Sequence, residues 1–417
     1  MTFAEMLRRT CTTGGRDTRG TSEILGLVFA FALIISLIAT SQLALTPVLN
    51  AGDEADHHHR VTADLATLDS AVFGVAGTDE TGRFAVETDI SYPERYLVVS
   101  PPDSTGTFAT TGENDAAITG AVAVSQASAY WDGSSKTLGT TQTLVYTPNY
   151  NERNSERLHI ESGASYLVTA DGTEIVHRQS LIRGTDVSLV LLDGELGGRT
   201  VAGQSVRITP QSASERAITV RSTASDPLTL EVPTALSNET WQRLLANESA
   251  VQSISYADAG PGSDYGTLTV ELAPGLYNMH LAHVTVGSPD AGGAIGAASL
   301  GPDDEVAYLS LESQNGTWVP TSGRETVVVR AYDKFGAPVS GATVEWENGS
   351  YGSVSAPDGA VTDERGRVSL QFTADDVSLN GPKSDSITVQ VVDRDETEIE
   401  VAFEVREFDD GVDIGPI

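Results

Sequence analysis

One long apolar stretch stands out in the pattern of hydrophobic and polar positions along the chain. The segment from Ile24 to Leu45 runs through 22 residues without a charge. At about 1.5 Å per residue, a helix of this length crosses the roughly 30 Å of hydrocarbon in a bilayer. No later stretch is comparably long and apolar, so we predict one transmembrane helix here, with the lipid bilayer as its partner.

A second helical pattern follows the apolar stretch. Val61, Leu65, Leu68 and Val72 recur at spacings of four, three and four, which draws one apolar stripe along a helix. Two interpretations remain open: the helix continues out of the membrane as a stalk, or it packs on its own domain. Pro47 is expected to kink the junction or to start a second helix.

Residues 76–287 alternate short runs of β-forming residues with Gly, Asn, Asp and Pro, which is typical of closely spaced strands. The runs are Tyr96–Val99, Thr143–Tyr146, Ser165–Val168, Val187–Leu192, Ala217–Val220, Thr267–Leu272 and Leu276–Val286. One short helix is expected with Ser237 as its N-cap, running to Asn247 with Trp241 and Leu244 on one face. We therefore predict a β-rich head with one inserted helix.

The C-terminal part of the chain has a clearer strand pattern. Residues 288–303 are rich in small and turn-forming residues, which predicts a linker. Several short strands separated by turns then fill residues 304–406 and indicate a β-sandwich, followed by an acidic tail at 407–417. The expected strands are Thr326–Asp333, Thr343–Glu347, Val368–Phe372, Ser386–Val392 and Glu398–Val405. The predicted fold class is mainly β, with an N-terminal helix, a head and a sandwich.

The charges before the apolar span predict its orientation. Arg8, Arg9, Arg16 and Arg19 precede it, and the short basic side of a membrane helix stays in the cytoplasm. We expect a single-pass protein of the cell membrane, with residues 1–20 as a cytoplasmic leader and the C-terminal bulk outside the cell. A cleaved secretory signal is the competing interpretation, but its apolar core is usually shorter, at about 7 to 15 residues.

The charge composition argues against one class of partner. The chain carries 58 acidic residues against 25 Lys and Arg, a formal net charge of −33. So acidic a surface repels phosphate backbones, which argues against nucleic-acid binding. Only Lys136, Lys334 and Lys383 are lysines. This balance resembles the proteins of salt-loving archaea, because carboxylates hold water and hydrated cations at molar salt, where a Debye length of about 3 Å screens their repulsion.

The residues just before the apolar span resemble an archaeal type IV pilin leader. The run Arg19 to Gly26 reads RGTSEILG. The resemblance implies cleavage between Gly20 and Thr21, with residues 21–75 retained as a transmembrane and juxtamembrane helix. The acidic residue found at the fifth mature position of many pilins would fall on Leu25, which departs from that pattern.

Two further resemblances concern the exported part. Residues Thr234 to Trp241, together with the strand that ends at Gly287, are similar to haloarchaeal pilin-like surface proteins. Residues 304–406 resemble bacterial Ig-like domains of the invasin and intimin type. The family's turn motifs are filled here by Asp333, Gly336, Pro338, Val339, Val344, Thr362, Asp363 and Gly366. This resemblance implies a spacer or adhesive module on a cell surface, without catalytic activity.

The sequence offers little that could carry chemistry. No nucleophile elbow, phosphate-binding loop or paired zinc-ligand spacing is present, so no catalytic residue, metal ligand or cofactor is assigned. The run His57-His58-His59 follows Asp53 and Glu54, but adjacent residues of a helix point about 100° apart and cannot converge on one ion. His280 and His283 lie three apart on an expected strand and face opposite sides.

Four Asn-x-Ser/Thr sequons are candidate glycosylation sites: Asn238, Asn247, Asn315 and Asn348. All four follow the apolar span and therefore fall in the part expected outside the cell.

These observations predict a membrane-anchored, exported cell-surface protein that acts as a pilin-like structural or adhesive subunit and is not an enzyme. Its expected partners are the bilayer, copies of itself or other pilins, and a surface ligand of unknown identity. Two alternatives remain: an unassembled surface-anchored binding protein, and an anchored extracellular hydrolase.

Overall fold

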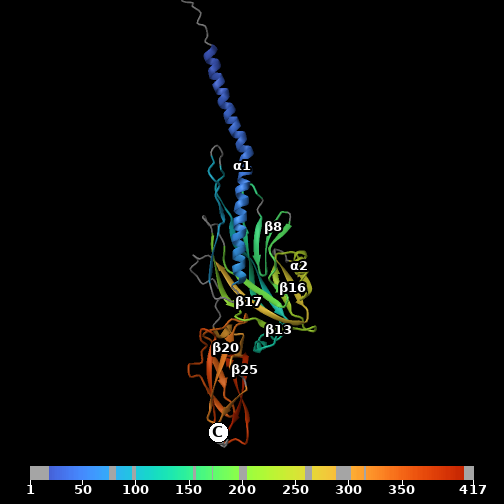
Figure 1. Ribbon diagram of the computed structural model, residues 1–417, viewed down its shortest axis with the longest axis vertical. Coiled ribbons are helices and arrows are strands. Elements are labelled where there is room, and N and C mark those ends of the chain that lie inside the picture. The colour runs from blue at the N-terminus through green and yellow to red at the C-terminus, as the bar shows by residue number, and fades with distance from the viewer. Residues whose placement is uncertain are drawn as a thin grey trace, which may run out of the picture. The chain divides into compact units, whose positions relative to one another are not determined.

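The computed structural model describes residues 18–74, 81–95, 100–153, 156–170, 172–196, 204–258, 265–287, 302–313 and 316–407 (Figure 1). The chain divides into two compact units. Unit 1 contains the residues up to 58 together with 90–104 and 150–153, and unit 2 contains 59–89, 105–149 and all residues from 154 onward. The C-terminal sandwich and the β-rich head, apart from residues 90–104 and 150–153, belong to unit 2.

The first element is helix α1, Thr18–Gly74, which runs for 57 residues without a break. Pro47 lies inside it and does not start a second helix, so that part of the expectation was wrong. A proline in a helix interior costs about 3 kcal/mol. The many Ala and Leu residues before it are strong helix formers, which offsets that local cost.

Two sheets form the head. The seven-stranded sheet has the order β1 (Gly82–Val86), β12 (Gln204–Ala213), β17 (Gly275–Gly287), β11 (Asp186–Asp193) and β10 (Ile182–Arg183). Within it β13 (Ile218–Ser222) pairs with both β17 and β5 (Val122–Ala123). Most of its pairs are antiparallel, but β11 and β17 run parallel, with Leu189 opposite Leu281.

The eight-stranded sheet is an antiparallel array. Its order is β15 (Val251–Ala257), β16 (Gly266–Leu272), β14 (Thr229–Thr234), β4 (Thr107–Thr119), β6 (Lys136–Thr147), β7 (Arg157–Glu161), β8 (Ala164–Thr169) and β9 (Gly172–His177). Four shorter elements complete the head: β2 (Asp89–Ile90), β3 (Ser104–Thr105), the 3₁₀ helix η1 (Gln126–Ala129) and helix α2 (Asn238–Leu245). Helix α2 begins after Ser237, whose side chain accepts a hydrogen bond from the Thr240 main chain, as predicted for its N-cap.

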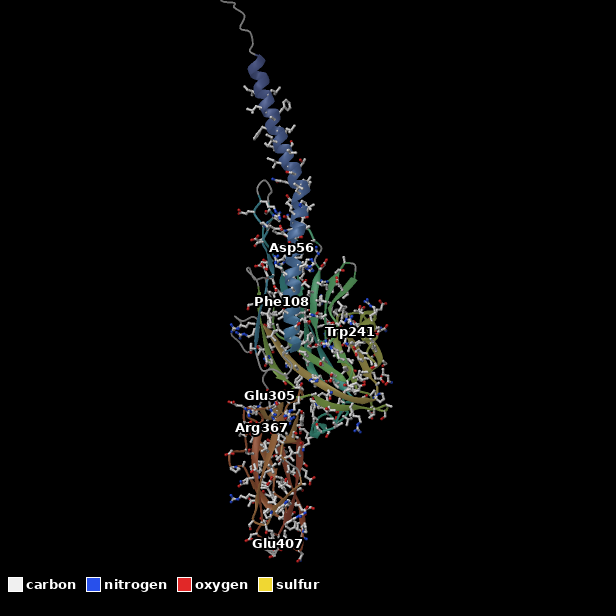
Figure 2. The ribbon with its side chains drawn as sticks, viewed as in Figure 1. Asp56, Phe108, Trp241, Glu305, Arg367 and Glu407 are labelled. Atoms are coloured by element: carbon white, nitrogen blue, oxygen red, sulfur yellow. The ribbon has the colours of Figure 1, made fainter. Side chains whose placement is uncertain are left out.

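The apolar stripe of α1 lies in the core of the head. Val61, Leu65, Leu68 and Val72 are at most 1% exposed and pack with apolar residues of both sheets. Phe108 of β4 belongs to the same cluster, and Figure 2 shows it beside the helix. Of the two open interpretations, packing on the protein's own domain is therefore the one observed, and residues 59–74 are part of the head.

A second apolar cluster occupies the other side of the head sheets. Strand β11 contributes to both clusters, with Val190 and Leu192 toward the helix and Leu189 and Leu191 away from it. This explains why the strand reads as a continuous apolar run and not as an alternating one. Trp241 of α2 is fully buried in the second cluster (Figure 2).

The C-terminal module is a sandwich of two four-stranded sheets. One has the order β18 (Tyr308–Leu311), β20 (Arg324–Tyr332), β23 (Arg367–Ala374) and β22 (Gly352–Ser355); the other has β19 (Thr317–Pro320), β25 (Arg394–Arg406), β24 (Lys383–Val391) and β21 (Val344–Glu347). Phe372 and Phe403, one from each sheet, stack with ring centroids 4.1 Å apart. The mainly β fold, with an N-terminal apolar helix, a β-rich head and a C-terminal β-sandwich, is thus confirmed.

Three expectations fall partly or wholly outside the described residues. The expected strand Tyr96–Val99 is one, and the acidic tail is described only at Glu407. Of the expected linker, only residues 302 and 303 are described, and they begin the short helix α3 (Pro302–Glu305). An acidic segment that starts with proline suits a first helical turn.

Candidate functional site

The first part of α1 presents its apolar side chains to the surroundings. Between Ile24 and Leu45 the large apolar residues other than the half-buried Ile38 are 50% or more exposed, and Leu43 reaches 83%. No part of the apolar window is buried within the described structure. This helix is long and apolar enough to cross a membrane. The backbone at Gly20 and Thr21 lies in the same helix, near its start at Thr18.

Two hydroxyl groups in this span form hydrogen bonds within the helix itself. The Thr40 hydroxyl donates to the Ser36 carbonyl at 2.9 Å, and the Ser41 hydroxyl donates to the Ile38 carbonyl at 2.8 Å. Such bonds from a side chain back to the preceding turn remove the cost of placing a free hydroxyl in hydrocarbon. The hydroxyls of Thr40 and Ser41 are therefore compatible with a position in a bilayer.

Polar residues on one face of α1, shortly after the apolar span, bond to two other chain segments, and we call this group the collar. We define the collar as Asn50–His58 of α1 with the residues of unit 1 that bond to them, which come from Tyr92 to Arg95 and Tyr150 to Arg153. At its centre Glu54 is fully buried. Glu54 accepts hydrogen bonds from the Tyr92 hydroxyl at 2.6 Å and from the main-chain N–H groups of Asn151 at 2.8 Å and Arg153 at 2.8 Å. The Glu152 N–H bonds to it as well, at 3.1 Å.

Other collar contacts extend along the helix. Arg95 donates to Asn50 at 2.9 Å and forms an ion pair with Asp53. A hydrogen bond of 2.9 Å joins His57 Nδ1 and the Tyr150 hydroxyl. Burial, reinforced by the hydrogen bond to Glu54, raises the pKa of Tyr92 to about 12, so this hydroxyl stays protonated as a donor. The collar thus joins three chain segments through charge-assisted hydrogen bonds.

The collar also accounts for the acidic and histidine run. The carboxylates of Asp53 and Glu54 are engaged by Arg95 and by Tyr92 with the 151–153 main chain. Among the residues the structure describes, no group of three or more His, Cys, Asp or Glu side chains could hold a metal ion. Sequence reasoning missed the collar because its partners lie about 40 to 100 positions away, and only the acidic run directly after an apolar helix marked the place.

The turn motif of the C-terminal module builds two linked turns. Asp333 accepts hydrogen bonds from the main-chain N–H groups of Phe335 and Ala337, both at 2.9 Å. Gly336 has φ +87°, a conformation that glycine adopts without strain. Pro338 forms an isolated antiparallel bridge with Tyr332, which closes the turn.

The second turn packs against the first. The Thr362 hydroxyl donates to the Val339 carbonyl at 2.8 Å and accepts from the Ala342 N–H at 2.9 Å. Asp363 accepts from two main-chain N–H groups that follow it, both at 2.8 Å. At Gly366, with φ +73°, a Cβ atom would lie 2.7 Å from the Ala331 carbonyl oxygen. The motif residues are therefore structural, and they fix the shape of this end of the module.

The same end of the module is bonded to the head. Ser212 of β12 donates to the Asp333 carboxylate, and Arg330 donates to Glu215 at 2.8 Å. Phe335 is 4% exposed and belongs to the apolar cluster of the head, where it stacks on His283 at 5.9 Å. We call these contacts the joint. The motif around Asp333 predicted a turn, but no feature of the sequence indicated that this turn contacts the head.

The head contains a buried acid close to a buried histidine. Glu161 ends β7 and is 2% exposed; it accepts hydrogen bonds from Thr234 and from the Ala235 N–H at 3.1 Å. Burial raises its pKa to about 7. His159, two residues earlier, stacks on Tyr166 at 5.1 Å, and burial lowers its pKa to about 4.

The sequons differ in their surroundings. Asn247 and Asn348 are exposed, whereas Asn238 is half-buried at the start of α2. Asn315 lies outside the described residues.

Comparison with known proteins gives limited matches. No family model matches the chain. An uncharacterized protein from Archaeoglobus fulgidus is 27% identical over 85 residues, which is 20% of this chain; the chain spans only 15% of that relative's length. This match is too short and too distant to assign a family.

Among solved structures, the chain is similar to domains 4 and 5 of the S-layer protein SbsC, with a TM-score of 0.20, 13% identity and coverage of 34% of this chain and 64% of that one. The D00-D0 domain of Intimin matches with a TM-score of 0.22 and 12% identity, over 47% of this chain and 94% of that one. The Lin-41 filamin domain matches with a TM-score of 0.17 and 18% identity, over 24% and 93%. The fold described above rests on the contacts of this chain and not on these scores.

Proposed function

We propose that this protein is an exported surface protein held in the cell membrane by α1, with its N-terminus in the cytoplasm and its head and sandwich outside. One observation carries the proposal: a single helix is apolar and exposed in its first part and is buried in the head in its second part. The first part needs an apolar environment that the described structure does not supply, and the second part makes the helix integral to the folded protein.

The size of the exposed span fits a bilayer. Removing a Leu, Ile or Phe side chain from water is worth about 1.5 to 3 kcal/mol. Ten or more such side chains are exposed between Ile24 and Leu45. Their transfer from water into lipid is therefore the largest favourable free-energy term available to this segment. The length of about 33 Å matches the hydrocarbon thickness.

A charge in the centre of the span tests the anchoring. Leu33→Arg combined with Ile34→Arg should release the protein from washed membranes into the soluble fraction, because each arginine at the centre of a membrane helix costs about 2.5 to 3.5 kcal/mol. The control pair Leu33→Ala with Ile34→Ala keeps the span apolar and should stay in the membrane. Equal membrane retention of the two double variants would contradict the anchor.

We further propose that the protein is a pilin-like structural or adhesive subunit whose partners are copies of itself or other pilins. The leader-like run at Arg19 to Gly26 supports this, as does the two-part helix, since apolar first halves could pack together while acidic heads cover the outside. Shearing of intact cells distinguishes assembly from simple anchoring. Recovery of the protein in sheared filaments supports assembly, and its complete retention on sheared cells argues for an unassembled anchored binding protein.

We propose no catalytic activity and no nucleic-acid partner. The net charge of −33 opposes binding to phosphate backbones. Glu161, the acid whose pKa is best suited to proton transfer, is buried and held by Thr234, and its burial supports a structural role. The alternative of an anchored hydrolase would require hydrolytic activity that disappears in the Glu161→Gln variant.

A further inference from the structure

We propose that Asn247 and Asn348 carry N-linked glycans and that Asn238 does not. This rests on the proposed export, because the sugar donors and the transferase for this modification act outside the cytoplasm. The sequence gives four equivalent motifs, and the structure separates the three that it describes.

The reaction sets the geometric requirement. The side-chain nitrogen Nδ2 of asparagine bonds to the anomeric carbon of a lipid-phosphate-linked sugar, the bond between that carbon and the phosphate oxygen breaks, Nδ2 loses one proton and the lipid phosphate leaves. The transferase must reach both Nδ2 and the hydroxyl two residues later. The folded protein must also leave room for a bulky, solvated product.

Asn247 meets both conditions. It lies in the turn just after α2, and both Asn247 and the sequon hydroxyl of Ser249 are exposed. The residue between them, Glu248, holds the turn in place through its main chain, which bonds to Leu245 and Val251. Within the described structure neither the Asn247 amide nor the Ser249 hydroxyl forms a side-chain hydrogen bond that would have to break.

Asn348 is held in an orientation that suits the reaction. The residue is exposed, and its Oδ1 accepts a hydrogen bond from the Val354 N–H at 2.7 Å, a bond that does not use the reacting atom Nδ2. Ser350 is exposed, and its main-chain N–H bonds to Asp385 at 2.7 Å, so the sequon lies in a hydrogen-bonded loop between β21 and β22. Glycosylation keeps Oδ1 and therefore keeps the bond to Val354.

Asn238 does not meet these conditions, because the hydroxyl of its sequon, on Thr240, is buried. Thr240 is 4% exposed, and its hydroxyl is 3.0 Å from the Ser237 hydroxyl and accepts a bond from Arg243 at 3.2 Å. These contacts form the first turn of α2, so reaching the hydroxyl requires unwinding the helix. The same Ser237 that caps α2 thus removes this sequon from the transferase.

The test is mass spectrometry of the full-length protein from a host that N-glycosylates exported proteins, with a secreted reporter of known occupancy as positive control. We expect glycopeptides at Asn247 and Asn348 and an unmodified peptide at Asn238. Ser249→Ala and Ser350→Ala should each remove one glycan mass from the intact protein, and Thr240→Ala should remove none. Ser350→Ala leaves the Asn348 bond to Val354 intact, so a lost glycan cannot be attributed to misfolding of that loop.

Two results would overturn the proposal: a glycan on Asn238, or unmodified Asn247 and Asn348 while the reporter is modified. Export is measured separately in a variant that combines Ala224→Cys, at an exposed position, with Cys11→Ala. Intact cells are treated with a membrane-impermeant maleimide, which labels the new thiol only if it lies outside the cell. A labelled but unglycosylated protein overturns the glycan proposal and leaves the proposed function standing. An unlabelled protein overturns both.

Discussion

Glu54 holds the collar together, because a fully buried carboxylate there receives donors from Tyr92 and from three successive main-chain N–H groups. Replacing it by Gln keeps its size but turns one acceptor oxygen into a donor that faces other donors. We expect Glu54→Gln to lower the free energy of unfolding by about 2 to 3 kcal/mol, measured by denaturant titration of the detergent-solubilised protein.

The matched control for this change is Glu152→Gln. Glu152 lies in the same loop but its side chain is exposed, so a change of less than about 0.5 kcal/mol is expected there. If the two variants unfold at the same denaturant concentration, the collar does not have the role assigned to it.

Glu161 and His159 should give the head opposite pH dependences. The pKa of Glu161 is raised from its usual 4.5 to about 7, so its contribution to stability is full below pH 4.5 and is lost as the pH rises to 7. The pKa of His159 is lowered from 6.5 to about 4, so its contribution is full above pH 6.5 and is lost as the pH falls to 4. Each amounts to about 3 kcal/mol, and the two largely offset each other in the native protein.

Single substitutions should expose the two opposing effects. As the pH rises from 4.5 to 7, Glu161→Gln should gain about 3 kcal/mol of stability relative to the native protein, because the native Glu161 loses its contribution over this range. As the pH rises from 4 to 6.5, His159→Gln should lose a similar amount relative to the native protein, because the native His159 gains its contribution over this range. Denaturant unfolding at several pH values measures both. Parallel stability profiles for the native protein and both variants would contradict the assignment.

At the scale of the element, helix α1 carries two different roles along one continuous structure. Leu68 is fully buried between the head sheets, while Leu37 is 64% exposed in the apolar span. Leu68→Ala should lower the unfolding free energy of the head by about 2 to 5 kcal/mol in detergent, through lost contacts and the cavity left behind. Leu37→Ala should leave it unchanged, and a similar loss for both would show that the span is part of the folded core.

The pattern of the sequence predicted those elements whose periodicity is local. The apolar span, the stripe from Val61 to Val72, the N-cap at Ser237 and strands such as β11, β16 and β20 follow from spacing alone, whereas β12 and β14 were not predicted. What spacing could not show was the environment of the stripe, because an amphipathic helix looks the same whether it faces a neighbouring molecule or its own sheets. The four-residue strands β18, β19 and β22 were not predicted, because four positions are too few to show a clear periodicity, although the equally short β21 was predicted.

The candidate site was predictable only in part, for a related reason. The motif from Asp333 to Gly366 marked two turns, since their glycines and carboxylates bond to neighbouring main chain. The partners of the collar and of the joint come from distant parts of the chain. Glu54 meets residue 153 and Asp333 meets Ser212, and a single sequence contains no signal for such pairs.

At the scale of unit 2, the joint should make the sandwich and the head unfold together. Phe335→Ala removes a nearly buried ring from the apolar cluster of the head. We expect calorimetry to show two separated transitions in this variant where the native protein shows one. Val361→Ala, at a 53% exposed position of the same module, is the control and should keep the native profile. A native protein that already unfolds in two separate steps would contradict the coupling.

The central claim is that α1 remains on the mature protein and anchors it in the membrane. The most direct test is the intact mass, with sequencing of the N-terminal peptide, of the protein recovered from washed membranes. The account predicts that the protein is in the membrane fraction and begins at Thr21, with the span from Ile24 to Leu45 still attached. A protein that begins after Leu45 and is recovered free of the membrane would contradict it.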